Sequence, residues 1–241
     1  MKQQPELSVV ITLFNEAQNI APLFARINEA LAGIDYEVIC VDDGSTDDTA
    51  KAVKSHASQQ IRLVCLTRNY GQTAAMAAGI DFAEGQFIAT MDGDLQNDPA
   101  DIPAMLQKLK DDDTDVVAGN RKNRQDKILL RKFPSMLANR LIRTLTGVKI
   151  QDYGCTLKVF KGGLAKRLGL YGELHRFIPI LAAMQGGRIV QMDVHHHPRI
   201  YGKSKYGIGR TFKVMSDLIL IVFFQKYFRR PIHLFGPLGI V

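Results

Sequence analysis

Two periods of hydrophobic residues alternate along the first 120 residues of the chain. Short apolar runs rich in β-branched residues are typical of buried strands, and segments with apolar residues every three or four positions are typical of helices. The runs predict strands at 7–13, 36–41, 61–66, 86–91 and 115–119, and the segments predict helices at 17–31, 47–57, 72–83 and 99–110. This alternation predicts an α/β fold with a mostly parallel, doubly wound sheet and helices on both of its faces.

The alternation weakens after residue 120. The pattern there predicts an amphipathic helix at 127–146, a short strand at 156–160, a helix at 175–185, an edge strand at 188–194 and a long amphipathic helix at 207–228. No apolar run reaches the about 18 residues that a membrane-spanning helix needs. The last stretch, PIHLFGPLGIV at 231–241, is apolar, and we interpret it as the first turns of a truncated transmembrane region.

Charge is divided unevenly between the two halves. Residues 1–120 hold 8 Lys and Arg against 19 Asp and Glu, whereas residues 121–241 hold 23 against 5. A strongly basic half favours a polyanionic partner, and nucleic acid and an anionic membrane are the two candidates. Cys40 and Cys65 lie in apolar runs and are expected to be buried, and three cysteines in all favour a reducing, cytoplasmic setting. The polar start predicts no signal peptide.

Acidic and amide residues follow the predicted strands of the first half, where ligands bind in open parallel sheets. Asp92 and Asp94, one residue apart after the fourth strand, can both reach a hard divalent cation such as Mg²⁺ or Mn²⁺. A solvated acidic turn is the simpler explanation of this pair alone. However, Asp42 and Asp43 follow the second strand and Glu16 follows the first, so we favour a site for a nucleotide and its phosphates.

Seven segments resemble the family 2 glycosyltransferases of the GT-A nucleotide-sugar fold, and within them the polyprenyl-phosphate glycosyltransferases. They are VVITLFNEAQNI, VDDGSTDDT, RNYGQTAAMAAG, MDGDLQNDP, DYGCTLKVF, HRFIPILA and PRIYGKSKYG, and they cover nearly the whole chain in family order. The resemblance implies a metal-dependent, inverting transfer of a hexose-type sugar from a UDP- or GDP-sugar to undecaprenyl or dolichyl phosphate. The Gln-x-x-Arg-Trp motif of processive synthases is absent, since the chain has no Trp.

The resemblance also implies roles for individual residues. The nucleotide-sugar site comprises Thr12, Phe14, Glu16, Asp42, Asp43, Arg68, Asn69, Gly71 and Asp92. The ligands of Mg²⁺ or Mn²⁺ are Asp92, Asp94 and Gln96. Residues at the diphosphate and acceptor are Arg121, Arg131, His175, Arg176, Lys203, Ser204 and Lys205. The catalytic residues are Asp94, Asp152, Arg121 and Arg199, and whether Asp152 is a base or orients an arginine is left open.

The expected organisation follows from these roles. Residues 1–120 bind the nucleotide sugar, 121–206 complete the same catalytic domain at the acceptor, 207–230 form an amphipathic helix on the membrane surface, and 231–241 begin the truncated region. We expect a protein at the cytoplasmic face of the inner membrane, anchored in its full-length form. Expected partners are the nucleotide sugar, the polyprenyl phosphate and an anionic membrane surface, but not nucleic acid. Self-association into a homo-oligomer is left open.

Other functions also fit parts of this pattern. A family 2 enzyme with a soluble or glycan acceptor is the nearest alternative. A nucleic-acid-binding protein explains the basic half but not the acidic strand ends, and its basic segments lack interleaved aromatic residues. A phosphoacceptor domain leaves residues 121–241 unexplained, and a nucleotidyl transferase favours a glycine-rich first loop. The run His195–His197 is not expected to bind a metal, because successive residues of a strand point to opposite faces.

Overall fold

The computed structural model describes residues 4–56, 58–121, 142–144, 146–201, 210–228 and 230–239. The chain forms two compact units, one of residues 1–127 and 152–203 and the other of residues 128–151 and 204–241. The helix predicted at 127–146 lies mostly outside the described residues, although 142–144 and 146 are helical. The functional boundaries expected at 120, 206 and 230 stay predictions.

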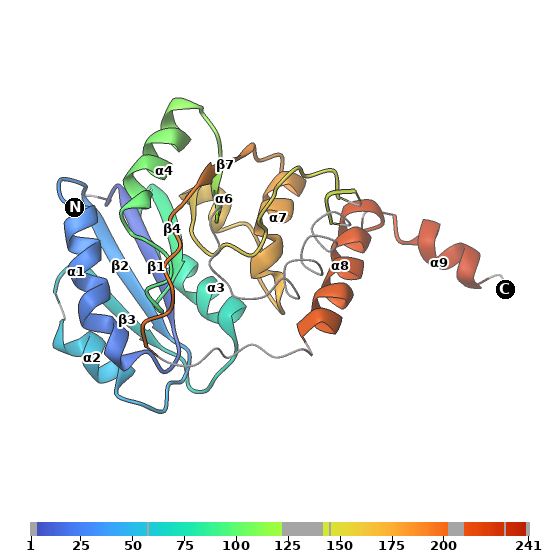
Figure 1. Ribbon diagram of the computed structural model, residues 1–241. Coiled ribbons are helices and arrows are strands. Elements are labelled where there is room, and N and C mark those ends of the chain that lie inside the picture. The colour runs from blue at the N-terminus through green and yellow to red at the C-terminus, as the bar shows by residue number, and fades with distance from the viewer. Residues whose placement is uncertain are drawn as a thin grey trace. The chain divides into compact units, whose positions relative to one another are not determined.

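A seven-stranded sheet forms the centre of the first unit (Figure 1). Its strands are β1 (Leu7–Leu13), β2 (Tyr36–Asp42), β3 (Ile61–Cys65), β4 (Phe87–Asp92), β5 (Val116–Asn120), β6 (Lys158–Lys161) and β7 (Ile189–Asp193). They are ordered β3-β2-β1-β4-β6-β5-β7, and only β6 is antiparallel to its neighbours. The predicted mostly parallel sheet is confirmed, and the strand expected at an edge, β7, lies there.

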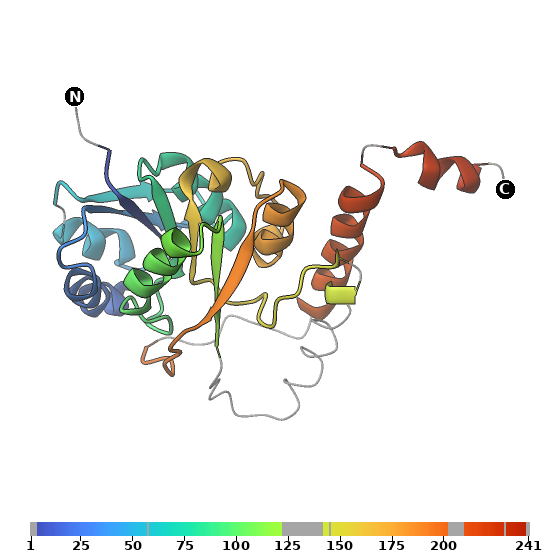
Figure 2. The ribbon, with the colours of Figure 1, turned by 90° about the horizontal axis from the view of Figure 1, so that it is seen from above.

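Helices cover both faces of the sheet (Figures 1 and 2). They are α1 (Ile20–Ala30) with a 3₁₀ turn at Ala17–Asn19, α2 (Thr49–Ser55), α3 (Gln72–Phe82), α4 (Asp101–Asp111), α6 (Gly162–Ala165) and α7 (Ile178–Met184) with a 3₁₀ turn at Leu174–Phe177. The four helices predicted between the strands of the first half are therefore all present. The short helix α6 was not predicted.

The central strand β1 is buried on both faces, which explains its uninterrupted apolar sequence. Leu7, Val9, Ile11 and Leu13 pack into the main core with residues of α1 and α4. Val10 points the opposite way, toward α3, where a Cβ added to Gly79 would lie 2.3 Å from the Val10 Cγ1 atom. The absence of a side chain at residue 79 thus lets α3 lie directly against the sheet.

The two cysteines expected to be buried behave differently. Cys40 lies on the interior strand β2 and is buried, and burial raises the pKa of its thiol to about 12. Cys65 ends β3 and is exposed, so its predicted burial is wrong. The reason is topological: β3 is the outermost strand of the sheet on its side, and its residues are covered less completely than those of β2.

The second unit contains α8 (Arg210–Lys226) and α9 (Ile232–Gly239), so the segment predicted at 207–228 is helical over 210–226. Its amphipathic, membrane-surface character stays a prediction. The ring of Phe223 lies 6.0 Å from those of both Phe224 and Phe235, measured between centroids. More than half of the surface of four apolar residues is exposed, namely Ile219, Phe228, Ile232 and Phe235. Within the described ranges, no helix combines the length and apolar character needed to cross a membrane.

Candidate active site

The carboxyl ends of three neighbouring strands meet at one edge of the sheet. Thr12 of β1 pairs in register with Asp92 of β4, and Leu13 pairs with Asp42 of β2. The backbone N–H of Asp43 continues this pattern by donating to the Leu13 carbonyl over 2.9 Å. The sequence predicted that these strand ends would converge, and the register brings their polar residues together as expected.

The carboxylate of Asp92 is held by three separate parts of the chain. Its Oδ1 atom accepts hydrogen bonds from Thr12 Oγ1 at 3.3 Å and Gln72 Nε2 at 2.5 Å, and its Oδ2 atom accepts one from Thr156 Oγ1 at 2.8 Å. Burial raises the pKa of Asp92, although these hydrogen bonds and the charge of Arg121 act in the opposite direction. The hydrogen bonds fix the orientation of the Asp92 carboxylate, and the raised pKa means that a nearby positive charge would stabilise its ionised form.

The loop after Asp92 turns sharply to bring Asp94 back to the same edge. A Cβ added to Gly93 would lie 2.1 Å from Leu13 Cδ2, so a larger residue between the two aspartates would require the buried Leu13 side chain to move. Leu95 has a φ of +63°, an unusual conformation for a residue with a side chain. The Gln96 N–H donates to Asp94 Oδ1 over 3.1 Å and stabilises the turn.

Arg199 joins Asp94 and Gln96, in the loop after β4, to Glu16, which follows β1. Its Nη2 atom donates to Asp94 Oδ2 at 2.5 Å and to Gln96 Oε1 at 3.4 Å, and its Nη1 atom lies 3.6 Å from Glu16 Oε1. Burial and the neighbouring charge of Asp92 raise the pKa of Asp94 to about 6, despite the opposing effect of Arg199. Four of the predicted site residues therefore form one connected cluster.

A second cluster consists of Arg121 and Asp152. The Nε atom of Arg121 donates to Asp152 Oδ2 at 2.6 Å, and its Nη2 atom donates to Oδ1 at 3.0 Å. Both side chains are largely buried, and the charge of Arg121 acts on Asp92. Because both oxygens of Asp152 accept hydrogen bonds from the guanidinium, this geometry favours the interpretation in which Asp152 orients the arginine.

The carboxylates at the end of β2 shape the adjacent loops. Asp43 accepts hydrogen bonds from the backbone N–H groups of Tyr70 at 2.7 Å and Gly71 at 2.9 Å, and Asp42 Oδ1 accepts the N–H of Ser45 at 3.1 Å. Gly71 has a φ of +94°, which favours glycine at this position. The two carboxylates thus fix the loops that follow β2 and β3.

The remaining predicted residues fall into three groups. Arg68 and Asn69 are exposed on the loop before Gly71, and Phe14 is half-buried beside the cluster. His175 is buried with its Nδ1 atom 2.7 Å from Thr73 Oγ1, and Arg176 Nη2 lies 3.4 Å from Glu173 Oε2. Four predicted residues, Arg131, Lys203, Ser204 and Lys205, lie outside the residues that the structure describes.

Three neutral residues contribute to the site without having been predicted. Gln72 and Thr156 hold Asp92, and the Oδ1 atom of Asn97 lies 2.9 Å from Thr156 Oγ1. Each lies in a segment that the sequence singled out, but a lone amide or hydroxyl has many uses in loops. Only their proximity to a buried carboxylate distinguishes them.

The donor set at this edge fits a divalent cation that arrives with an anionic substrate. Among the described residues, no three His, Cys, Asp or Glu side chains gather closely enough to hold a metal. Asp92 and Asp94 supply oxygen atoms, burial raises the pKa of both, and the charge of Asp92 further raises the pKa of Asp94. Mg²⁺ usually binds through one or two carboxylates, with substrate oxygens completing its shell. The two carboxylates could therefore bind one divalent cation together, and Gln96 is the predicted third protein ligand.

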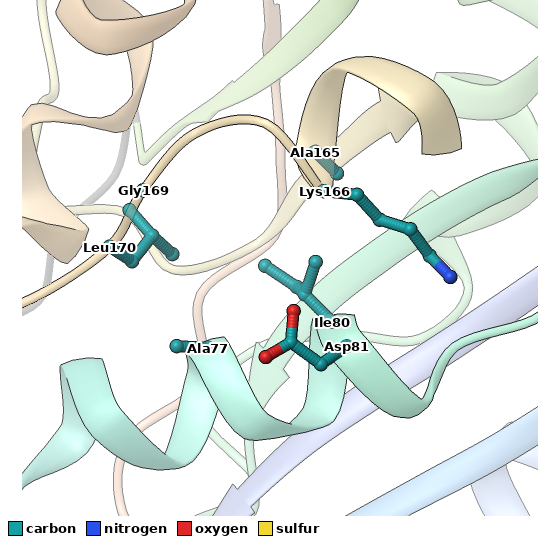
Figure 3. A pocket seen from close by; sticks show the side chains of 7 residues that line it. All are labelled: Ala77, Ile80, Asp81, Ala165, Lys166, Gly169 and Leu170. Carbon is teal, nitrogen blue, oxygen red and sulfur yellow. The ribbon is translucent and has the colours of Figure 1, made fainter.

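A separate hollow of about 160 Å³ lies away from these carboxylates. Figure 3 shows Asp81 and its neighbours on α3 facing Lys166 and the loop that follows α6. Helix α3 begins beside Asp92 with Gln72 and runs back toward the opposite edge of the sheet, so residues 77–81 lie far along it. The hollow is not part of the carboxylate cluster.

Residues 8–169 match the sequence model of the family described as Glycosyl transferase family 2. Among solved structures, glucosyl-3-phosphoglycerate synthase from Mycobacterium tuberculosis, crystallised with Mn²⁺ and uridine diphosphate, aligns with a TM-score of 0.70 at 17% identity over 92% of this chain and 80% of that one. The S. aureus protein TarS in complex with UDP-GlcNAc aligns with a TM-score of 0.63 at 19% identity, over 90% and 66% of the two chains. These structures share the fold with this protein.

Two relatives are more similar in sequence. A dodecaprenyl-phosphate galacturonate synthase of Rhizobium johnstonii is 49% identical over 99% of this chain and 72% of the relative. An undecaprenyl-phosphate 4-deoxy-4-formamido-L-arabinose transferase of an Enterobacter species is 40% identical over 89% of this chain and 66% of the relative. The match over residues 8–169, the two relatives and the acidic strand ends all agree: the chain belongs to glycosyl transferase family 2.

Proposed function

We propose that the protein transfers a sugar from a nucleotide diphosphate sugar to a polyprenyl phosphate, with inversion at the anomeric carbon. The observation that carries this proposal is the cluster of Asp92, Asp94, Glu16 and Arg199 at the carboxyl edge of the sheet. Both sequence relatives carry names that include a polyprenyl phosphate and a sugar. A galacturonate donor is the first candidate, because the relative with 49% identity is a galacturonate synthase.

The acidic pair has a specific task in this reaction. Asp92 and Asp94 would hold Mg²⁺ or Mn²⁺, with Gln96 as the predicted third ligand. A bound cation supplies positive charge where the diphosphate leaves, which is where electrostatic catalysis contributes most. Arg199 pairs with Asp94, so its guanidinium is available to the diphosphate once the cation neutralises Asp94. Asp42 and Asp43 keep the loops around the nucleotide in place.

The acceptor requires orientation rather than a general base. The second pKa of a phosphate monoester is about 6, so a lipid phosphate is already a nucleophile at neutral pH. It needs cations that hold it in line with the anomeric carbon. Arg121 is suited to this role because Asp152 fixes its guanidinium through two hydrogen bonds. Arg131, Lys203, Ser204 and Lys205 remain predicted contacts of the acceptor phosphate.

The second unit is suited to contact with a membrane surface. Ile219 of α8, Phe228 after that helix, and Ile232 and Phe235 of α9 are exposed. The sequence of this unit, residues 128–151 and 204–241, holds 11 Lys and Arg against one Asp and no Glu. Each basic residue near an anionic surface contributes about 1 kcal/mol of attraction. We propose that this unit binds the cytoplasmic face of the membrane that contains the lipid acceptor.

A single assay tests the reaction class and the substrate together. The purified protein is incubated with Mn²⁺, undecaprenyl phosphate in vesicles, and one radiolabelled donor at a time from a panel of UDP- and GDP-sugars that begins with UDP-galacturonate. We expect label from one donor to partition into the organic phase, and none to do so without the lipid phosphate. Transfer to a water-soluble acceptor instead, with no labelled lipid, would contradict the proposal.

A further inference from the structure

Three alternate residues after β7 each pair with an aspartate of the segment after β4. His195 pairs with Asp101, His197 with Asp98 and Arg199 with Asp94, at 2.8, 2.7 and 2.5 Å respectively. The 195–199 segment leaves the edge strand β7 and crosses to the loop after β4, a strand in the middle of the sheet (Figure 1). Because alternate residues of an extended chain share one face, all three side chains point to the same loop.

The backbone of the 195–199 segment is anchored as well. The N–H of His195 donates to Asp101 Oδ2 at 2.7 Å, and Asp101 is only 6% exposed. The N–H of His197 donates to the Gln96 carbonyl at 2.9 Å, and the Gln96 amide returns a hydrogen bond to the His197 carbonyl at 3.4 Å. His196 and Asn97 form an isolated antiparallel bridge between these anchors. The segment is therefore aligned residue by residue against the acidic loop.

The His197–Asp98 pair is the one nearest to Arg199 along the segment. The Nε2 atom of His197 must donate the proton of the 2.7 Å hydrogen bond, because the Asp98 carboxylate accepts. Burial raises the pKa of Asp98, but the hydrogen bonds from His197 and from the Ala100 backbone lower it on balance. His195 is a weaker candidate, since 76% of its side chain is exposed, and exposed pairs contribute little.

We propose that His197 is a positioning residue of the transfer reaction. Its hydrogen bond to Asp98 fixes the register of the 195–199 segment, and that register places the Arg199 guanidinium at Asp94. His197 contacts no substrate in this role and acts only through Arg199. The proposal rests on the proposed function for its kinetic test, and it gives one member of the His195–His197 run a structural role.

A double-mutant cycle between His197 and Arg199 tests this dependence. In the wild-type background we expect His197→Ala to lower kcat about tenfold, since a misplacement of about 1 Å near reacting groups costs up to about 100-fold. In the Arg199→Ala background the same change should lower kcat less than twofold, because the guanidinium that His197 positions is already absent. An equal loss in both backgrounds would show that His197 acts by another route and would overturn the proposal. The same cycle is measured on UDP affinity in the presence of Mn²⁺, which does not require turnover.

Two substitutions separate a positioning role from a general loss of structure. Glutamine places an N–H near the position of His Nε2, so His197→Gln should recover at least half of wild-type kcat, whereas His197→Asn, with a shorter side chain, should not. His196→Gln is the matched control, because residue 196 points to the other face of the segment, and we expect it to keep wild-type kcat. Equal loss in the Gln and Asn variants would contradict the proposed hydrogen bond.

Hydrogen–deuterium exchange provides a measurement that is independent of catalysis. We expect peptides spanning 194–201 to exchange at least tenfold faster in His197→Ala than in the wild type, and at the wild-type rate in His197→Gln. Unchanged protection in His197→Ala would overturn the proposal even in an active enzyme. If no sugar is transferred by the wild type while exchange responds as expected, the proposed function fails and the positioning role of His197 stands.

Discussion

Arg121 donates two hydrogen bonds to the carboxylate of Asp152, from Nε at 2.6 Å and from Nη2 at 3.0 Å. The pair joins the end of β5 to the segment before β6, and both side chains are largely buried. Asp152 also accepts the N–H of Gly154 at 3.1 Å. Both oxygens of Asp152 thus accept hydrogen bonds from the protein, which favours a role in orienting Arg121 over a role in proton transfer.

We expect Asp152→Asn to lower kcat by about 10- to 100-fold, because one of the two hydrogen bonds to Arg121 is lost and the guanidinium is held less firmly. Arg121→Lys should cause a loss of similar size, since an ammonium group cannot form a two-pronged pair. Steady-state kinetics of both single variants and of the double variant check this. If Asp152 were a base, the Asn variant would lose nearly all activity and the Lys variant would lose much less.

Removal of divalent cations should abolish transfer. Asp92 and Asp94 have raised pKa values because of burial, and the charge of Asp92 adds to the effect on Asp94, so without a cation the leaving diphosphate would face two poorly neutralised carboxylates. We expect no turnover in EDTA, full recovery with Mn²⁺ or Mg²⁺, and no recovery in Asp94→Ala. Thermal shift with Mn²⁺ and UDP provides the second measurement, and a shift in the Ala variant equal to that of the wild type would contradict the metal role.

Asp94→Asn should stabilise the metal-free protein at neutral pH. The pKa of Asp94 is raised from 3.8 to about 6 in the folded state, so folding favours the protonated form. The free energy of unfolding therefore falls as the pH rises from about 4 to about 6, and a shift of this size corresponds to at most about 3 kcal/mol. Urea denaturation of both proteins at pH 4 and pH 7 checks this, and the advantage of the Asn variant should be largest at pH 7. The opposite pH trend would contradict the raised pKa.

Gln72 should matter for catalysis although it carries no charge. Its amide donates to Asp92 Oδ1 at 2.5 Å from the first residue of α3. We expect Gln72→Ala to lower kcat about tenfold and Gln72→Glu to lower it further, because a third carboxylate would repel Asp92. The control is Gln107→Ala, which removes an exposed amide that donates to Asp111 within its own helix. Turnover at saturating Mn²⁺ is the measurement, and a Gln72→Ala variant as active as the control would refute this role.

The three cysteines should differ sharply in reactivity. Cys65 is exposed, whereas Cys40 and Cys155 are buried, and burial raises the pKa of both buried thiols, that of Cys40 to about 12. Only the thiolate reacts rapidly with alkylating reagents. Mass spectrometry after brief iodoacetamide treatment of the native protein should find label at residue 65, and all three cysteines should be labelled in urea. Rapid native labelling of Cys40 would contradict its place on the buried strand β2.

Local sequence patterns were sufficient for most of the first half of the fold. The strands β1 and β4 are apolar runs with turn signals at each end. A strand buried on both faces needs apolar residues at nearly every position, so its sequence is easy to identify. The edge strand β3 shows the limit of such reasoning, since Cys65 lies in an apolar run and is nevertheless exposed. An apolar run indicates a strand, but the strand's place in the sheet decides how much of it is covered.

The same limit applied to the site. Asp92, Asp94 and Glu16 were predicted because charged residues at strand ends are conspicuous, whereas Gln72, Asn97 and Thr156 were missed. Neutral polar residues are common in loops, and their role depends on which buried carboxylate they reach. That information is a distance between parts of the chain, and no local pattern contains it.

The sequence by itself determined that a parallel sheet places its acidic residues along one edge, because hydrophobic periodicity and strand direction are local properties. Only the tertiary structure decided which cation faces which carboxylate: Arg199 pairs with Asp94 across 105 positions, and Arg121 pairs with Asp152 across 31. A basic residue has the same charge wherever it lies in the chain. The carboxylate with which it pairs depends on which groups the packed strands and loops bring within hydrogen-bonding distance.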